Sequence, residues 1–119
     1  MTKIRQFKTG ATRDTNEGKL DFEGFNSPIV EKEFAKYMHK HRFQADGTLR
    51  DSDNWQKGIP KDVYAKSLID HCIDFWLEHR GFESRDGIID ALCGLRFNVN
   101  GYLFELLKHK KKKVKSKII

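Results

Sequence analysis

A cluster of carboxylates and an imidazole lies on one side of the helix predicted over residues 60–80. At about 100° per residue, five polar side chains fall within roughly 100° of arc, with no lysine or arginine among them: Ser67, Asp70, His71, Asp74 and Glu78. Two carboxylates about 4 Å apart repel by about 4 kcal/mol at an effective dielectric of about 20, so crowding them requires a cation. That cation is either a metal ion or a lysine or arginine from another segment. The alternative is an ordinary solvated acidic face.

A second stripe of small and polar residues follows the helix predicted over residues 84–108. Its members recur at spacings of 4, 4, 3 and 4: Asp90, Gly94, Asn98, Gly101 and Glu105. A glycine inside a helix costs about 1 kcal/mol relative to alanine. Two glycines on one face therefore indicate that another helix or a ligand comes close to it.

Three predicted helices must position these residues. The first spans residues 28–42, because Ser27 is a typical N-cap residue and Pro28 suits the first helical position. The second spans residues 60–81 and ends at a glycine, and the third spans residues 84–108. The acidic cluster belongs to the second helix and the glycine stripe to the third.

The fold predicted from these elements is all-α, a small bundle of three main helices with an irregular N-terminal arm. The arm is residues 1–26, the helical domain residues 27–109 and a lysine-rich tail residues 110–119. Apolar residues cover most of the circumference of the third helix, which is typical of a helix that is central in a bundle or shared between subunits. Three helices cannot cover it alone. We therefore expect oligomerisation, as a homodimer or a higher homo-oligomer, to complete the bundle.

The net charge of +6 is concentrated near the C-terminus. Residues 108–117 hold seven lysines and no acid, and without these lysines the chain carries 16 basic and 17 acidic residues. A terminal lysine block is most often solvated. Its alternative role is weak, non-specific and salt-sensitive contact with nucleic acid. No aromatic residue is interleaved with the lysines as a base-stacking surface requires, so this alternative is the weaker one.

The composition indicates one globular, cytoplasmic domain. The 119 residues are 38% hydrophobic, 34% charged and 12% aromatic, which is too aromatic for a disordered chain. Cys72 and Cys93 lie among apolar residues of helical patterns, as reduced core thiols do. No apolar run approaches the length of a membrane span, and the N-terminus has no signal peptide, so we expect no membrane partner.

Several short motifs between residues 17 and 107 point to a family. They are Glu17-Gly18-Lys19, the stretch Asp53-Asn54-Trp55-Gln56-Lys57-Gly58, Tyr64 with Ser67-Leu68, His71, and then Asp90, Asn98 and Gly101-Tyr102. On these motifs the chain resembles the small, mostly phage and prophage proteins of the dATP/dGTP diphosphohydrolase N-terminal domain family. That family is grouped with the all-α, MazG-like nucleoside triphosphate pyrophosphohydrolases. A phage-encoded member would act in the host cytoplasm.

The resemblance implies a metal site. In the MazG-like group one helix carries E-E-x-x-E and the next carries E-x-x-D, and together they hold magnesium on the substrate's phosphates. This chain has Asp70-His71-x-x-Asp74 at the first place and Glu83-Ser84-Arg85-Asp86 at the second, with Asp90 one turn later. The second motif matches, whereas a histidine and shorter acids replace the paired glutamates of the first. The implied metal ligands are Asp70, Asp74, Asp86 and Asp90, with Mg²⁺ or Mn²⁺ as the cofactor.

The first functional hypothesis is therefore magnesium-dependent hydrolysis of a nucleoside triphosphate to the monophosphate and pyrophosphate, a step of phage nucleotide metabolism. Glu78, or His71 as the alternative, would take the proton of the attacking water. The residues expected to bind the nucleotide are Lys19, Lys57 and Arg85 at the phosphates and Asn98 with Trp55 or Tyr64 at the base. Arg50, in the long loop over residues 43–59, is a further candidate for a phosphate contact.

Three other interpretations remain open at this stage. In one, the protein binds a nucleotide without turnover and sequesters a signalling nucleotide that a host uses in defence. In another, it is a nucleic-acid accessory protein that acts through its lysine tail. In the third, His71 and the acids are structural partners of nearby residues such as Arg80, Arg85 and Arg96.

Overall fold

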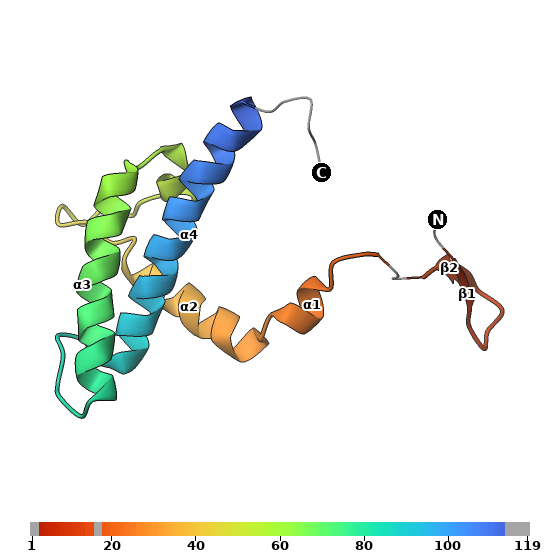
Figure 1. Cartoon of the computed structure of the whole chain (residues 1–119), viewed down its shortest axis with the longest axis horizontal. Coiled ribbons are helices and arrows are strands. Elements are labelled where there is room, and N and C mark those ends of the chain that lie inside the picture. Colours follow the sequence, from red (N-terminus) through yellow and green to blue (C-terminus); the bar gives the residue numbers. More distant parts are fainter. Residues whose placement is uncertain (1–2, 16–17, 114–119) are drawn as a thin grey trace. The chain divides into compact units, whose positions relative to one another are not determined.

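The computed structural model describes residues 3–15 and 18–113, with side chains as far as residue 110. The chain divides into two compact units, Met1–Lys32 and Glu33–Ile119. The fold is mostly helical, at 59%, and the described residues form four helices, three of them long, together with one antiparallel strand pair (Figure 1). The prediction of a mainly helical fold is therefore confirmed.

The first unit contains more regular structure than the irregular arm that was predicted. Strands β1 (Ile4–Gln6) and β2 (Thr12–Asp14) pair in antiparallel register. The turn between them closes through the amide of Gly10, which donates to the carbonyl of Phe7 at 2.9 Å and has φ of +90°, a conformation that glycine adopts readily. A short helix, α1 (Phe22–Phe25), follows. The prediction was wrong here because three-residue strands are too short to show an alternating pattern.

Helix α2 (Pro28–Lys40) begins at the residue predicted from the sequence. The amide of Glu31 donates to the Ser27 carbonyl at 2.9 Å, as expected when proline occupies the first helical position. The first turn of α2 belongs to the first unit and the remainder to the second. Tyr37 is the buried residue of this helix.

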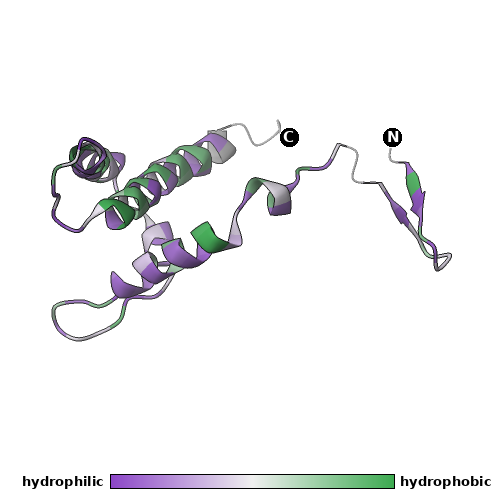
Figure 2. Cartoon of the chain, turned by 90° about the horizontal axis from the view of Figure 1, so that it is seen from below, coloured by the Kyte–Doolittle hydropathy of each residue, from purple (hydrophilic) through white to green (hydrophobic). Residues whose placement is uncertain are grey.

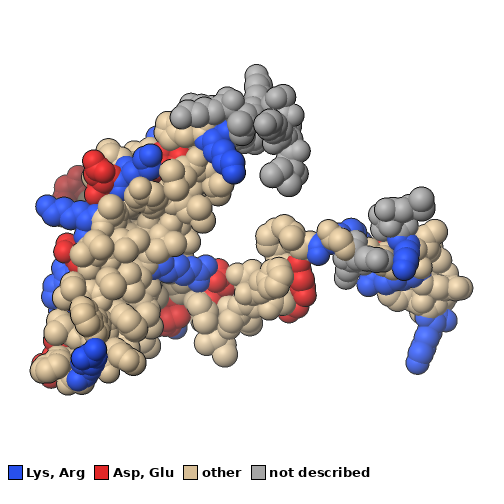
Figure 3. Space-filling model, viewed as in Figure 1, with Lys and Arg blue, Asp and Glu red and all other residues tan. Residues whose placement is uncertain are grey.

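Helices α3 (Lys61–His79) and α4 (Ile88–Lys113) form an antiparallel pair in the second unit (Figure 1). A Cβ atom added to Gly94 would lie 2.5 Å from the His71 ring, and one added to Gly101 would lie closer still to the Tyr64 ring. The glycine stripe therefore admits two side chains of α3, which confirms the expectation of a close neighbour on that face. Apolar residues recur along α4 as far as Leu107 (Figure 2), and charged residues cover little of the α3–α4 surface seen in Figure 3.

The sequence predicted that α4 begins at Ser84, but the helix begins four residues later, at Ile88. Residues 80–87 form a connecting loop that ends at Gly87, whose φ is +87°. Ser84 is held in this loop by Glu78, which accepts hydrogen bonds of 2.8 Å from both the amide and the hydroxyl of Ser84. The tetrapeptide from Glu83 to Asp86 is consequently not helical. The prediction that Asp86 lies on the third helix, one turn before Asp90, is wrong for this reason.

The long segment between α2 and α3 folds back on itself before reaching α3. Phe43 and Leu49 form an isolated antiparallel bridge around a turn at Gly47, and a short 3₁₀ helix, η1 (Asn54–Lys57), follows. Trp55 of η1 packs edge-on against Phe97 and Phe104 of α4, with ring centroids 6.3 and 5.1 Å apart. These contacts hold the segment against α4.

Within residues 3–15 and 18–113, no helix combines the length and apolarity needed to cross a bilayer. The lysine-rich tail predicted over residues 110–119 begins inside α4, which extends to Lys113. Residues 114–119 lie outside the described part of the chain, and with them most of the segment expected to contact nucleic acid.

Candidate functional site

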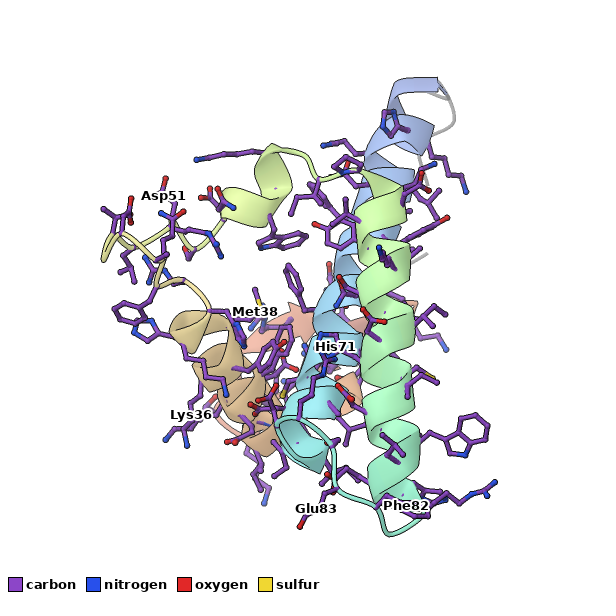
Figure 4. The ribbon with its side chains drawn as sticks, turned by 90° about the vertical axis from the view of Figure 1, so that its left-hand side faces the viewer. Lys36, Met38, Asp51, His71, Phe82 and Glu83 are labelled. Carbon is purple, nitrogen blue, oxygen red and sulfur yellow. The ribbon has the colours of Figure 1, made fainter. Side chains whose placement is uncertain are left out.

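The second unit contains a cleft of about 630 Å³, bounded by α2, the segment after it, α3 and α4. Figure 4 shows Met38 of α2 and His71 of α3 on its facing sides, with Asp51 at its outer end. The volume lies in the range of small-molecule sites. The other lining residues are Ala35, Tyr37, His39, His41, Arg42, Arg50, Ser52, Asn54, Trp55, Ser67, Arg85, Asp86, Phe97 and Asn98.

Basic side chains outnumber acids around this cleft. Three arginines and three histidines line it, against two aspartates, Asp51 and Asp86. Guanidinium groups are hydrogen-bond donors without acceptor capacity, so their partners are anions or neutral acceptors, and a neutral imidazole offers one donor and one acceptor. The cleft is therefore suited to an anionic ligand, although the folded body outside the lysine block is nearly neutral in charge.

Arg42 and Arg50 are fixed by backbone carbonyls at the mouth of the cleft. The Arg42 Nε donates to the Arg50 carbonyl at 2.8 Å, and the Arg50 Nη1 donates to the His41 carbonyl at 2.9 Å. The Arg50 amide also donates to the Arg42 carbonyl at 2.9 Å. Each side-chain bond uses one of the five N–H donors of a guanidinium. Both groups are thus positioned before any ligand arrives.

Arg85 is positioned by Asp74, one of the predicted metal ligands. Its Nε and Nη2 atoms donate to the Asp74 Oδ2 at 2.9 and 2.5 Å. This hydrogen-bonded pair raises the pKa of Arg85. The Asp74 side chain is 13% exposed and that of Arg85 60% exposed, so the acid is the buried anchor and the arginine extends toward solvent.

Aromatic rings and an amide line the deeper part of the cleft. Phe97 lies between Trp55 and Tyr64, at ring-centroid distances of 6.3 and 5.8 Å. The Asn98 Nδ2 donates to the Gly94 carbonyl at 2.7 Å, which fixes the orientation of a residue that is only 4% exposed. Burial raises the pKa of Tyr37, so its hydroxyl stays protonated and able to donate a hydrogen bond.

Two of the histidines have defined surroundings. His71 sits over Gly94, in space that a larger residue would fill. The His41 ring lies 4.4 Å from that of Tyr37, centroid to centroid. Partial burial lowers the pKa of His41, and the neighbouring Lys40 ammonium lowers it further. His41 is therefore mainly neutral at pH 7 in the free protein.

Asp74, Asp70 and Asp86, three of the acids predicted to hold a metal, all raise the pKa of Arg85 through their charges, so they lie around that guanidinium. Asp74 is hydrogen-bonded to Arg85, Asp90 pairs with Lys40, and Asp70 is exposed on α3 outside the cleft lining. Glu78, predicted to be catalytic, accepts from Ser84. Asp86, in the α3–α4 loop, lines the cleft. Among the described residues, no group of three His, Cys, Asp or Glu side chains could hold a metal ion. In the described part of the chain, Arg85 and Lys40 thus stand beside Asp74 and Asp90, where the resemblance implies a metal ion.

The remaining predicted site residues divide between the cleft and other parts of the molecule. His71, Trp55, Arg85, Asp86 and Asn98 come together around the cleft. Lys57 lies outside its lining and pairs with Asp51 at 3.6 Å. Tyr64 is 1% exposed, with its ring packed between Gly101 and Phe97, so it has no free face for a base. Lys19 belongs to the first unit.

Several lining residues were not predicted from the sequence. His39, His41 and Arg42 follow one another at the end of α2, where basic residues are common because they interact favourably with the helix dipole. Because basic residues are common at this position, their presence in the sequence does not by itself indicate a binding site. Tyr37 is the buried residue of α2 and also lines the cleft. Arg50 was predicted as a phosphate contact and does line the cleft.

Comparison with known proteins yields no match to a family model, to a curated protein or to a solved structure. The geometry of the second unit is thus the basis for a functional assignment.

Proposed function

We propose that the second unit binds a nucleotide in its cleft, without a metal held by the protein. The observation that carries this proposal is the lining itself, in which three arginines and three histidines share one cavity with Trp55, Phe97 and Tyr37. A nucleotide combines the two chemistries that such a lining accommodates, a polyanion and a flat aromatic base. The cavity of about 630 Å³ has room for both.

The phosphates would lie at Arg42, Arg50 and Arg85. A guanidinium presents a planar set of donors that matches the oxygens of a phosphate, and bidentate bonds of this kind are among the stronger hydrogen bonds in proteins. Because backbone carbonyls and Asp74 already hold these side chains, less conformational entropy is lost on binding. His39 and His41 would add donors when protonated.

The base would lie deeper, toward Trp55 and Phe97. Aromatic side chains stack on every base, and each stacked base contributes about 1–3 kcal/mol. The buried amide of Asn98 provides a hydrogen-bonding group that distinguishes one base edge from another.

Binding without turnover is favoured over magnesium-dependent hydrolysis. The acids that a MazG-like site needs are engaged with Arg85, Lys40 and Ser84, and within the described residues no three His, Cys, Asp or Glu side chains form a metal-binding group. A nucleotide-binding protein of this kind would act by sequestration, for which a signalling nucleotide is the natural target. This proposal retains the nucleotide ligand that the family resemblance implies but not the hydrolysis of that nucleotide.

Calorimetry with ATP, dATP, dGTP and a cyclic dinucleotide, each in EDTA and in Mg²⁺, tests the proposal. We expect at least one nucleotide to bind in EDTA and to be recovered intact by chromatography after denaturation of the complex. The variant Arg50→Gln should weaken that binding by about tenfold or more, because it removes a charge-assisted bond. The matched control is Lys57→Gln, another exposed cation of the same segment, which should change affinity less than twofold.

Three results would contradict the proposal. They are no binding of any of these nucleotides, equal losses in the Arg50 and Lys57 variants, and release of pyrophosphate or monophosphate that depends on Mg²⁺. Circular dichroism of Arg50→Gln separates a binding defect from a disturbed loop, since Arg50 also bonds the His41 carbonyl.

A further inference from the structure

Helix α4 carries a heptad pattern on a side that lies about 100° around the helix from the stripe packed against α3. Six residues recur at spacings of 4, 3, 4, 3 and 4: Ile88, Leu92, Leu95, Val99, Tyr102 and Leu106. This is the a/d pattern of a coiled coil, in which one helix packs its apolar seam against another. We name these six residues the α4 seam. At about 1.5 Å per residue the α4 seam extends roughly 27 Å along the helix.

The second unit leaves the α4 seam open. Leu92 is 46% exposed, Val99 47% and Leu106 43%, and Leu95 and Tyr102 are half-buried, whereas Gly94, Asn98 and Gly101 on another side of the same helix are buried. The apolar strip is visible along α4 in Figure 2, and Figure 3 shows few charged groups over it. A continuous apolar surface of this length marks an association site.

We infer that a second copy of this chain covers the α4 seam, with the two α4 helices antiparallel. In an antiparallel coiled coil each a position meets a d position of its partner. Centred between Leu95 and Val99, the pairing brings Leu95 opposite Val99 of the partner subunit and Leu92 opposite Tyr102 of the partner subunit. Ile88 then meets Leu106 of the partner subunit, so that every layer of the seam is filled by apolar side chains.

The charges near the two ends of α4 favour this orientation. Residues 83–90 contain three acids and one arginine, whereas residues 105–113 contain five lysines and one glutamate. An antiparallel pair brings the acidic segment of each copy beside the lysine segment of the other. A parallel pair would place two lysine segments side by side, and its helix dipoles would be aligned unfavourably. Charge complementarity thus selects an antiparallel homodimer.

The α4 seam and the cleft occupy different sides of the helix. Asn98, which lines the cleft, lies on the buried side of α4, and Val99 lies on the exposed side. Dimerisation therefore does not require a nucleotide, and the two proposals can fail independently.

The mass of the full chain in solution tests the inference, measured by sedimentation equilibrium over a range of concentrations. We expect twice 13.9 kDa for the natural sequence and 13.9 kDa for Val99→Glu, in which each carboxylate would be buried against Leu95 of the partner subunit near the centre of the seam. The matched control is Ile69→Glu on the outer side of α3, where the native residue is 59% exposed, and this variant should remain dimeric. Circular dichroism checks that both variants are helical, and Val99→Asn replaces Val99→Glu if helicity is lost.

Disulfide trapping tests the orientation, in a background where the exposed Cys72 is replaced by serine. A mixture of Leu92→Cys and Tyr102→Cys chains should form cross-linked dimers, whereas Leu92→Cys alone should not, because two copies of residue 92 lie about 15 Å apart in the antiparallel pair. Efficient cross-linking of Leu92→Cys alone would show a parallel pair and overturn the inference. So would a monomeric natural chain, an unchanged mass for Val99→Glu, or loss of the dimer on deletion of residues 1–26 alone, which would identify the N-terminal segment as the occupant.

Discussion

Two sides of α4 differ in how closely other residues pack against them. On the buried side, Gly94 and Gly101 leave spaces that the rings of His71 and Tyr64 fill. On the exposed side, Leu92 and Val99 are about half accessible. The buried side is specified by a close fit between particular residues, whereas the exposed side is specified only by spacing and apolarity. A fit of the first kind orients the side chains of a site, and a surface of the second kind favours association.

The largest effect is expected from filling the space at Gly101. A methyl group there would overlap the Tyr64 ring, which is only 1% exposed and has no room to move. Overpacking of this kind costs about 1–3 kcal/mol or more, and the better helix propensity of alanine offsets up to about 1 kcal/mol. We expect Gly101→Ala to lower the free energy of unfolding by about 2 kcal/mol, measured by urea denaturation.

Asn100, the residue before Gly101 in α4, provides the control for the Gly101→Ala variant. Asn100→Ala should change the free energy of unfolding by less than about 0.5 kcal/mol. Equal effects at residues 100 and 101 would mean that the close fit of Tyr64 against α4 does not exist. Gly94→Ala should be intermediate, because His71 is partly exposed and its ring can turn toward the cleft.

A smaller effect is expected at Asp74, which anchors Arg85. Asp74→Asn retains the shape and removes the charge that orients the guanidinium, so nucleotide affinity should fall by about threefold and the melting temperature by a few degrees. Both are measured by calorimetry. If Mg²⁺ stabilises the natural protein and not Asp74→Asn, Asp74 is a metal ligand and the structural interpretation of this acid is wrong.

The smallest effect concerns pH and His41. Because the pKa of His41 is lowered in the free protein and a bound anion would raise it, the ligand and a proton bind together. Nucleotide affinity should therefore rise as the pH falls through the pKa of the ligand-bound form, and level off below that of the free form. We expect a gain of about twofold between pH 7.5 and 5.5, measured by calorimetry.

The variant His41→Asn isolates this contribution, since protonation of the ligand phosphates and of the other histidines is common to both proteins. An identical pH dependence in the variant would exclude His41 from the site.

The lowered pKa of His41 also affects the folding stability of the unliganded protein, and here a fall in pH is unfavourable. Protonation favours the unfolded chain, so the contribution of His41 to stability is present above pH 6.5 and decreases as the pH falls toward its folded pKa.

Much of the helical framework was predictable because its signals are local. Ser27 and Pro28 locate the start of α2, and the glycine spacing in α4 correctly indicated a close neighbour. The start of α4 was not predictable, because Ser84 and Arg85 are held in the loop by Glu78 and Asp74 of the preceding helix, six and eleven residues earlier. The hairpin of the first unit was missed because its strands are only three residues long.

The candidate site was predicted in part. The sequence places the acids of α3 on one arc of a helix, and the interpretation that a cation from another segment relieves their crowding applies to Asp74, whose partner is Arg85. Whether that cation is a metal or an arginine depends on which loop packs beside the helix. The periodicity of residues along one helix does not show which loop packs beside it.

The amino-acid sequence by itself determined the three long helices, the small residues that let α3 approach α4, and the heptad of the α4 seam. These follow from propensity and periodicity, which act over a few residues. Only the tertiary structure decided that the acids are anchors and that His39, His41, Arg42 and Arg50 line a common cleft. The reason is that a binding site depends on the distances between segments, and those are determined by packing.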